Sequence, residues 1–309
     1  MHGTTNELIE ECEKMKKVSV IMPCHNDGKY INQSINCVKE QTYPNVELVV
    51  IADGSTDHQT KEQLSRINYH DFQLLYTDHV RPAAARNYGI QHATGEYILP
   101  LDADDLIDKT YIEKAVAVLD KYDNIGAVYC QADKFGCERG YWDLPPYSRD
   151  KLLLDNIIFV TSLFRKSDWE KLNGFCESLV NGMEDYDFWL SILELGREFY
   201  QIPEVLFHYR VKQHSRTTLF KKDRSIVSET YRSIYFRHKP LYQKYMDEYC
   251  LALRASLLDR INYIDMARKL SIGKLTESLV IRVAYKFPQL KRILKKVFLR
   301  GNEQGEEKT

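Results

Sequence analysis

Short apolar runs of strand length alternate with segments of helical periodicity from Val18 to Tyr129. The apolar runs read VSVIMP, VELVVIA, FQLLY, YILPLD and IGAVY, and a segment of helix length separates each from the next. Between the first two runs, Ile31, Ile35 and Val38 recur at the spacing of one helix face. Repeated units of this kind predict an α/β fold in which helices flank a mostly parallel sheet.

The composition is that of an ordinary globular protein: 309 residues, 44% of them hydrophobic, and a net charge of -1 from 43 basic and 44 acidic residues. These values exclude a collagen-like fibre, a disordered chain and a polytopic membrane protein. No apolar run reaches the roughly 18 residues that cross a bilayer, and the first residues lack the apolar core of a signal peptide. We therefore expect a cytoplasmic protein whose seven cysteines are reduced thiols.

Three polar clusters follow predicted strands, at the edge where parallel sheets bind ligands. They are Pro23-Cys24-His25-Asn26, Asp53-Gly54-Ser55-Thr56-Asp57 and Asp102-Ala103-Asp104-Asp105. The chain has neither the GxGxxG motif of dinucleotide sites nor a P-loop. The carboxylates of Asp102 and Asp104 suit a hard divalent cation, Mg2+ or Mn2+, that shares its coordination with substrate phosphates. An aspartate after a strand is also a common turn residue or helix cap, which is the alternative for Asp57 and Asp105.

Four segments in chain order resemble the motifs of the family 2 glycosyltransferases, which have the GT-A fold. They are VSVIMPCHNDGKYINQSI, VELVVIADGSTD, AAARNYGIQHATGEYILPLDADD and GMEDYDFWLSI. The resemblance extends from Val18 to Thr217, about two thirds of the chain. It implies an enzyme that moves a sugar, with inversion, from a nucleotide sugar, usually a UDP-sugar, to an acceptor hydroxyl. It also implies a GT-A catalytic domain over residues 17–216, preceded by an N-terminal extension over residues 1–16.

The resemblance assigns nucleotide-sugar binding to residues after the first two strands. Pro23 and His25 would line the pocket of the base, with His25 where the family usually has a Tyr, and Asn26 would belong to the same site. Asp53 would bond the base. The family often has a second Asp just before it, and this chain has Ala52 there.

The resemblance also assigns the chemical groups. Arg86 would lie near the nucleotide and its diphosphate. Asp102 and Asp104 match the DxD pair, with Asp104 as the more direct ligand of Mg2+ or Mn2+. Glu184 and Asp185 match the family's ED motif, which implies Asp185 as the base that takes the proton of the acceptor hydroxyl. The residues alone leave a second interpretation open, in which both acids complement the positive end of a helix dipole.

Beyond the sheet, FHYRVKQHSRTT is similar to a family segment in which a His follows the Arg by two places. This chain has Lys212 at that position, with His208 and His214 nearby. Arg210, Lys212 or His214 would close over the diphosphate, and His214 is a further candidate metal ligand. His208 fits a partly buried strand histidine better than a metal ligand.

Residues 131–149 have little periodicity and are rich in Gly, Pro and aromatic residues, which predicts a long loop. Tyr141, Trp142 and Tyr147 in this segment would offer stacking platforms for an acceptor sugar. Packing into the core is the alternative for the same three side chains.

Helical signals dominate after residue 225, so we expect a helical region over residues 217–300 and a disordered tail over residues 301–309. From Arg268 to Arg300, ten basic residues face one acidic residue. Residues 290–300 combine an apolar face with a basic one, which favours binding to an anionic membrane surface. A lipid-linked saccharide acceptor at the inner face of a bacterial cell membrane, in surface-polysaccharide synthesis, fits this pattern. The alternative is a helix packed on the catalytic domain.

Two other functions stay open at this stage. A nucleotidyltransferase also pairs acidic metal ligands with an α/β sheet, but it would leave Glu184 and Asp185 without a role. A non-catalytic nucleotide-sugar or glycan-binding module on the same fold would have no need of both Asp104 and Asp185. Nucleic acid is not an expected partner, because the basic stretch has few interleaved aromatic residues.

Overall fold

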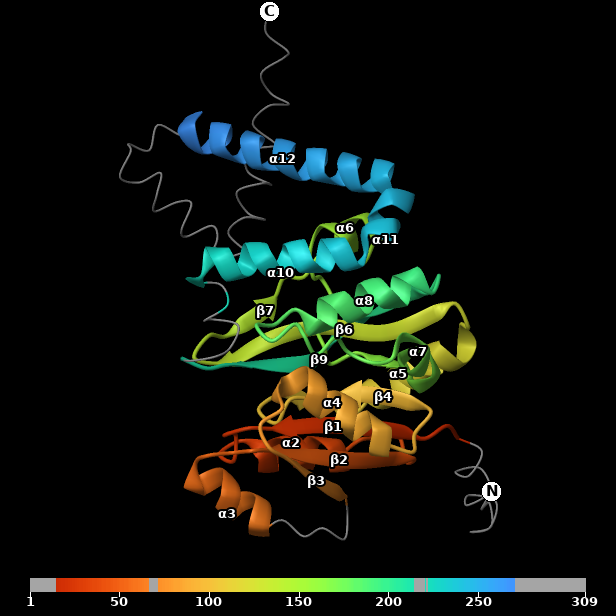
Figure 1. Ribbon diagram of the computed structural model, residues 1–309, viewed down its shortest axis with the longest axis vertical. Coiled ribbons are helices and arrows are strands. Elements are labelled where there is room, and N and C mark those ends of the chain that lie inside the picture. Colours follow the sequence, from red (N-terminus) through yellow and green to blue (C-terminus); the bar gives the residue numbers. More distant parts are fainter. Residues whose placement is uncertain (1–14, 67–71, 214–219, 221, 270–309) are drawn as a thin grey trace, which may run out of the picture. The chain divides into compact units, whose positions relative to one another are not determined.

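The computed structural model describes residues 15–66, 72–213, 220 and 222–269 (Figure 1). The chain forms two compact units, Met1–Met246 and Asp247–Thr309. The second unit is described through helix α12 (Met246–Lys269). The predicted amphipathic segment 290–300, the tail 301–309 and residues 1–14 lie outside the described residues.

The first unit is built on a mixed sheet with the strand order β3-β2-β1-β4-β8-β6-β9-β5, and β7 pairs with β6. The strands are β1 (Val18–Cys24), β2 (Val46–Asp53), β3 (Gln73–Thr77), β4 (Tyr97–Pro100), β5 (Leu106–Ile107), β6 (Ile125–Gly136), β7 (Gly140–Trp142), β8 (Leu163–Arg165) and β9 (Glu198–Val211). Strands β3, β2, β1 and β4 pair in parallel, as do β6 and β9, whereas β8 runs antiparallel to β4 and β6. The predicted α/β fold with a mostly parallel sheet is confirmed.

The helices of the first unit are α2 (Ile31–Lys39), α3 (His58–Arg66), α4 (Arg81–His92), α5 (Tyr111–Lys121), α6 (Arg149–Leu154), α7 (Lys166–Leu172), α8 (Glu184–Glu194), α10 (Arg224–Arg237) and α11 (Lys239–Lys244). Helices α2, α4, α5 and α7 contact strands of this sheet, and further helices of the unit complete the fold. Helix α4 lies on β1 and β2, and a Cβ added at Gly89 would come within 2.6 Å of the Ile51 side chain. Glycine at this position therefore lets the helix approach the sheet closely. Among the described residues, no helix is both long and apolar enough to span a bilayer.

The prediction of a long loop over residues 131–149 is wrong. Strand β6 continues to Gly136 and forms a hairpin with β7, while helix α6 begins at Arg149. Strand β9 is continuous over its whole length, and it pairs with β6 from Ile125 to Gly136 through several register shifts. Hydrogen bonding to a long neighbouring strand stabilises β6 here, where the local sequence pattern is weak.

The junction of α10 and α11 is tied to helix α8 by a buried charge cluster. The Nε2 atom of His238 lies 3.1 Å from Asp187 Oδ1, and its Nδ1 atom lies 3.0 Å from Glu194 Oε1. Arg237 donates from Nε to the same Asp187 oxygen, at 2.7 Å. Burial opposes the charged form of His238, but the hydrogen bonds to the two carboxylates outweigh it and raise its pKa to about 8.

This cluster predicts a stability difference between neutral and alkaline pH. The pKa of His238 is higher in the folded than in the unfolded chain. Its contribution to the free energy of unfolding is therefore complete below about pH 6.5 and is lost as the pH rises through about 8. A rise from 6.5 to about 8 corresponds to a loss of about 2 kcal/mol in the free energy of unfolding. Denaturant unfolding at pH 6 and at pH 9 measures this difference in the free energy of unfolding. His238→Gln should lack this component, and an equal pH dependence in both proteins would contradict the assignment.

Candidate functional site

The ends of β2, β1 and β4 lie side by side, because these strands are neighbours in the sheet. Each is followed by one of the polar clusters found in the sequence. His25 follows β1, Asp53 ends β2, and Asp102 and Asp104 follow β4. A parallel sheet opens its ligand crevice at this edge, so the three clusters face one common region.

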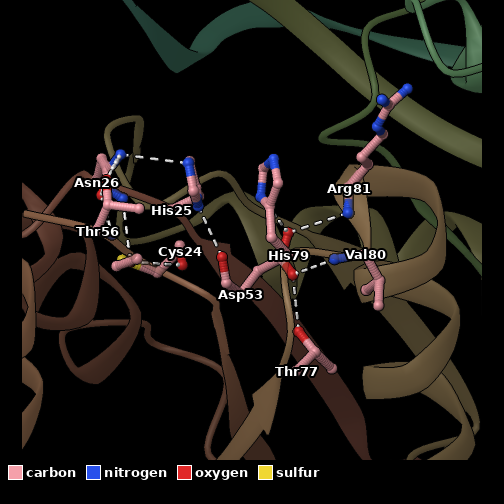
Figure 2. Close-up of polar contacts among 10 residues, drawn as sticks. Cys24, His25, Asn26, Asp53, Thr56, Thr77, His79, Val80 and Arg81 are labelled. Carbon is pink, nitrogen blue, oxygen red and sulfur yellow. Dashed lines mark hydrogen bonds and ion pairs between the residues drawn. The ribbon is translucent and has the colours of Figure 1, made fainter.

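The Asp53 carboxylate is held in a fixed orientation by the loop that follows β3 (Figure 2). Its Oδ1 atom accepts hydrogen bonds from Thr77 Oγ1 at 2.8 Å and from the Val80 backbone N–H at 2.7 Å. Its Oδ2 atom accepts a hydrogen bond from the Arg81 backbone N–H at 3.1 Å. Asp53 is 3% exposed, so its donors replace the water that it loses on burial.

Two histidine rings lie over this carboxylate. His25 Nδ1 donates to the Asp53 backbone oxygen at 2.7 Å, and the His25 and His79 ring centroids are 4.1 Å apart (Figure 2). The side-chain donor atoms of His25, Asp53 and His79 lie within 4.8 Å of one another, as in a metal site. The two Asp53 oxygens already accept three hydrogen bonds from N–H and O–H donors, and the planes of the two rings are tilted by only 30°. The arrangement therefore suits a planar aromatic ligand better than an ion.

Asn26 connects the loops after β1 and β2. It adopts a positive φ of 59°, and its Oδ1 atom accepts hydrogen bonds from the backbone N–H groups of Thr56 and Asp57, at 2.8 and 3.1 Å. Pro23, the other predicted donor-site residue here, lies inside β1 opposite Ile51. The structure thus gives Asn26 the task of joining two loops of the site.

Arg86 bridges the acidic loop and the start of helix α8. Its Nη2 atom lies 2.7 Å from Asp102 Oδ1, and its Nη1 atom lies 2.8 Å from Glu184 Oε1. Arg86 and Glu184 are only 1% and 2% exposed, whereas the Asp102 side chain is 37% exposed. Arg86 was predicted to lie near the diphosphate, but two carboxylates already bind its buried guanidinium. It orients Asp102, and its place near the diphosphate stays a prediction.

The second carboxylate of the DxD pair also has a cationic partner. Lys212 Nζ lies 2.7 Å from Asp104 Oδ2 and 2.7 Å from Asp27 Oδ1. The Arg210 side chain donates from Nε to the Asp104 backbone oxygen at 2.6 Å, and its backbone N–H donates to Asp105 at 2.7 Å. Burial raises the pKa of Asp104 to about 6, although the Lys212 charge opposes this shift. Arg210 and Lys212 thus both reach the acidic loop, and His214 lies outside the described residues.

The donor set of this loop fits a divalent ion such as Mg2+ or Mn2+. Asp102 and Asp104 supply carboxylate oxygens, the ligands that both ions prefer. The ion pairs with Arg86 and Lys212 each involve one oxygen of the carboxylate concerned. The Asp102 side chain is also exposed enough to contact a ligand from the crevice.

The two acids at the start of α8 lie in different surroundings. Glu184 is buried against Arg86, whereas Asp185 is partly exposed and its Oδ2 atom accepts a hydrogen bond from Asn156 Nδ2 at 3.0 Å. Partial burial, together with the charge of Glu184, raises the pKa of Asp185 to about 6. A carboxyl group with this pKa is mostly ionised at pH 7 and is suited to accept a proton.

The predicted acceptor residues Tyr141 and Trp142 differ in exposure: Tyr141 is exposed and Trp142 is half-buried. Tyr141 is 37% exposed, whereas the Trp142 ring packs against Tyr209 and Phe159 with centroid separations of 5.0 and 6.1 Å. His208 is a partly exposed residue of β9 that pairs with Asp133 at 2.7 Å. Tyr141 is therefore the better candidate of the first two for contact with a sugar ring.

Three further residues contact the site, and the sequence pattern gave them no role: Asp27, His79 and Asn156. Polar residues after a parallel strand were the signal for the other clusters, and the same signal applies to His79, which follows β3. Asp27 belongs to the loop that contains His25 and would be found by extending that cluster by two residues. Asn156 has no comparable signal, because its contact with Asp185 depends on tertiary packing alone.

Comparison with known proteins identifies the family. The model of glycosyl transferase family 2 matches residues 19–190. The putative glycosyltransferase EpsE of Bacillus subtilis is 34% identical over 208 residues, which cover 64% of this chain and 74% of EpsE. The chondroitin synthase of Escherichia coli is 28% identical over 217 residues, which cover 68% of this chain but 31% of that longer protein.

Solved structures show the same fold. TarS of S. aureus in complex with UDP has a TM-score of 0.54 at 23% identity, over 63% of this chain and 61% of that one. The mannosyltransferase PcManGT of Pyrobaculum calidifontis, in complex with GDP-Man and Mn2+, has a TM-score of 0.58 at 19% identity. The match covers 89% of this chain and 86% of that protein. With a family match over more than half of its length, and with that family's motifs gathered along one edge of the sheet, the chain belongs to glycosyl transferase family 2.

Proposed function

We propose that this glycosyltransferase moves a sugar, with inversion and with the help of Mg2+ or Mn2+, from a UDP-sugar to a hydroxyl of a lipid-linked saccharide. The observation that carries the proposal is the Arg86 bridge. It joins Asp102 of the DxD loop to Glu184, which directly precedes Asp185. One buried cation thus couples the group that would hold the donor's diphosphate to the group that would activate the acceptor.

On the donor side, the stacked His25 and His79 rings and the fixed Asp53 carboxylate suit a nucleobase. Uridine as the nucleoside is supported by the complexes of TarS with UDP and with UDP-GlcNAc. A divalent ion held by Asp102 and Asp104 would neutralise the negative charge that develops on the leaving diphosphate.

On the acceptor side, Asp185 would take the proton as the hydroxyl oxygen attacks the anomeric carbon and the bond from that carbon to the diphosphate breaks. Asn156 Nδ2 donates to Oδ2 of Asp185 at 3.0 Å and the Tyr186 backbone N–H donates to Oδ1 at 2.8 Å, which fixes the direction of the carboxylate. Each oxygen has a second lone pair, which would accept the proton of the acceptor hydroxyl. Inversion follows because this site offers one carboxylate as a base and Glu184 is engaged by Arg86.

The donor assignment predicts a ligand-specific gain in stability. In a thermal-shift panel of UDP, GDP and CMP sugars with Mn2+, Mg2+ or EDTA, one UDP-sugar should stabilise the protein only with metal. A ligand present at 100 times its dissociation constant raises the free energy of unfolding by about 2.7 kcal/mol. Asp104→Ala should lose this shift, and Asp123→Ala, which removes an exposed carboxylate before β6, should keep it. Stabilisation by a GDP-sugar alone would contradict the choice of UDP.

The base assignment predicts a loss of turnover without a loss of donor binding. Asp185→Asn should lower kcat by about a hundred- to ten-thousand-fold, the usual contribution of a general base. In the wild type, kcat/KM should rise as the pH increases through about 6, because the base acts in its ionised form. Steady-state UDP release measures both.

Glu113→Gln removes an acid from the first turn of another helix, α5, and serves as the control for a helix-dipole effect. It should leave turnover unchanged. Near-normal turnover of Asp185→Asn with intact donor binding would show that Asp185 is not the base.

The lipid-linked acceptor predicts that the protein binds anionic membranes. The basic segment 290–300 should confer this binding, so removal of residues 288–309 should abolish co-sedimentation with phosphatidylglycerol vesicles. Neutral phosphatidylcholine vesicles are the control and should bind neither protein. Equal sedimentation of the truncated and full chains with anionic vesicles would refute the membrane contact.

A further inference from the structure

The ammonium group of Lys212 joins three separate segments of the chain. It lies 2.7 Å from Asp104, in the loop after β4, and 2.7 Å from Asp27, in the loop after β1. Lys212 itself directly follows β9. Its Nζ atom therefore occupies a position between two carboxylates, where a small cation would bind.

Neighbouring contacts hold Lys212 in this position. Two residues earlier, Arg210 donates both its backbone N–H and its side-chain Nε to the acidic loop, at 2.7 and 2.6 Å. The Arg210 guanidinium also lies 4.3 Å from the ring centroid of Tyr30 and 4.2 Å from that of Phe135. The end of β9 is thus fixed against the acidic loop, so the lysine is not a freely moving surface side chain.

The surroundings make this ion pair stronger than a surface pair. The side chains of Lys212, Asp27 and Asp104 are 28%, 19% and 12% exposed, so water screens their charges only in part. A divalent ion would need oxygens of the same Asp104 carboxylate, and its charge would repel the ammonium at this distance. The two cations cannot both bind Asp104 at full strength.

We propose that Lys212 is a tethered counter-ion that competes with the divalent ion for Asp104. The inference rests on the proposed function and adds an order of events to it. Without donor, the ammonium neutralises Asp104 and the protein binds a divalent ion weakly. The diphosphate of the donor brings oxygens for both cations, so ion and donor enter together.

The first test measures Mn2+ binding in the absence of donor, by electron paramagnetic resonance. Lys212→Met removes the charge but keeps a chain of similar length, and should bind Mn2+ at least about tenfold more tightly than wild type, a difference of 1.4 kcal/mol. The control is Lys114→Met, which breaks a surface pair with Glu204 and should leave Mn2+ affinity unchanged. Equal or weaker Mn2+ binding by Lys212→Met would overturn the proposal.

A second measurement uses the unaltered protein, because loss of Lys212 leaves Asp104 without its counter-ion and can impair folding. Amine labelling read by mass spectrometry should modify Lys212 slowly in EDTA and several-fold faster in Mg2+ without donor, while Lys114 reacts at the same rate in both. Unchanged labelling of Lys212 at saturating Mg2+ would refute the competition.

A sugar-transfer assay on the same wild-type protein distinguishes failure of the Lys212 proposal from failure of the proposed function. If wild type transfers sugar and Lys212→Met binds Mn2+ no more tightly than wild type, only the role of Lys212 is wrong. If wild type neither binds Mn2+ in the presence of any UDP-sugar nor releases UDP, the proposed function fails, and the competition fails with it.

Discussion

The site depends on one buried cation, Arg86. Taking a guanidinium out of water costs several kcal/mol unless carboxylates compensate it, and two do so here, at 2.7 and 2.8 Å. Because the fork of Arg is planar and rigid, its two nitrogens fix the direction of both partners. Asp102 and Glu184 are far apart in the chain, on a loop after β4 and on α8, and this contact sets their relative position. Removal of Arg86 would leave Glu184 buried without compensation, so the geometry and the stability of the site are coupled.

The orientation of the Asp53 carboxylate depends on a strained turn of the backbone. His79 and Arg81 have positive φ angles of 54° and 74°, which are uncommon for residues other than glycine and cost roughly 1–3 kcal/mol each. The strained turn aims the N–H groups of Val80 and Arg81 at the Asp53 carboxylate. It also packs on Gly54, where a Cβ would come within 2.5 Å of the His79 nitrogen. The hydrogen bonds to Asp53 offset part of this strain.

The sequence predicted what depends on local pattern and on general rules of sheet topology. The alternation of strands and helices, and the rule that ligands bind beyond parallel strand ends, were enough to group His25, Asp53 and Asp104. The hairpin of β6 and β7 was missed, because its stability comes from pairing with β9 and not from local periodicity. The pairing of Arg86 with Glu184 joins positions 98 residues apart, and no local pattern encodes such a contact.

The two adjacent acids of α8 lie in different environments. Successive residues of a helix point about 100° apart, since one turn contains 3.6 residues. Glu184 therefore points inward to Arg86, while Asp185 stays partly exposed beside Asn156. The fixed negative charge of Glu184 adds to partial burial in raising the pKa of Asp185 to about 6. The charge of the buried Glu184 thus raises the pKa of Asp185. A carboxylate with this higher pKa accepts a proton more readily and is still mostly ionised at neutral pH.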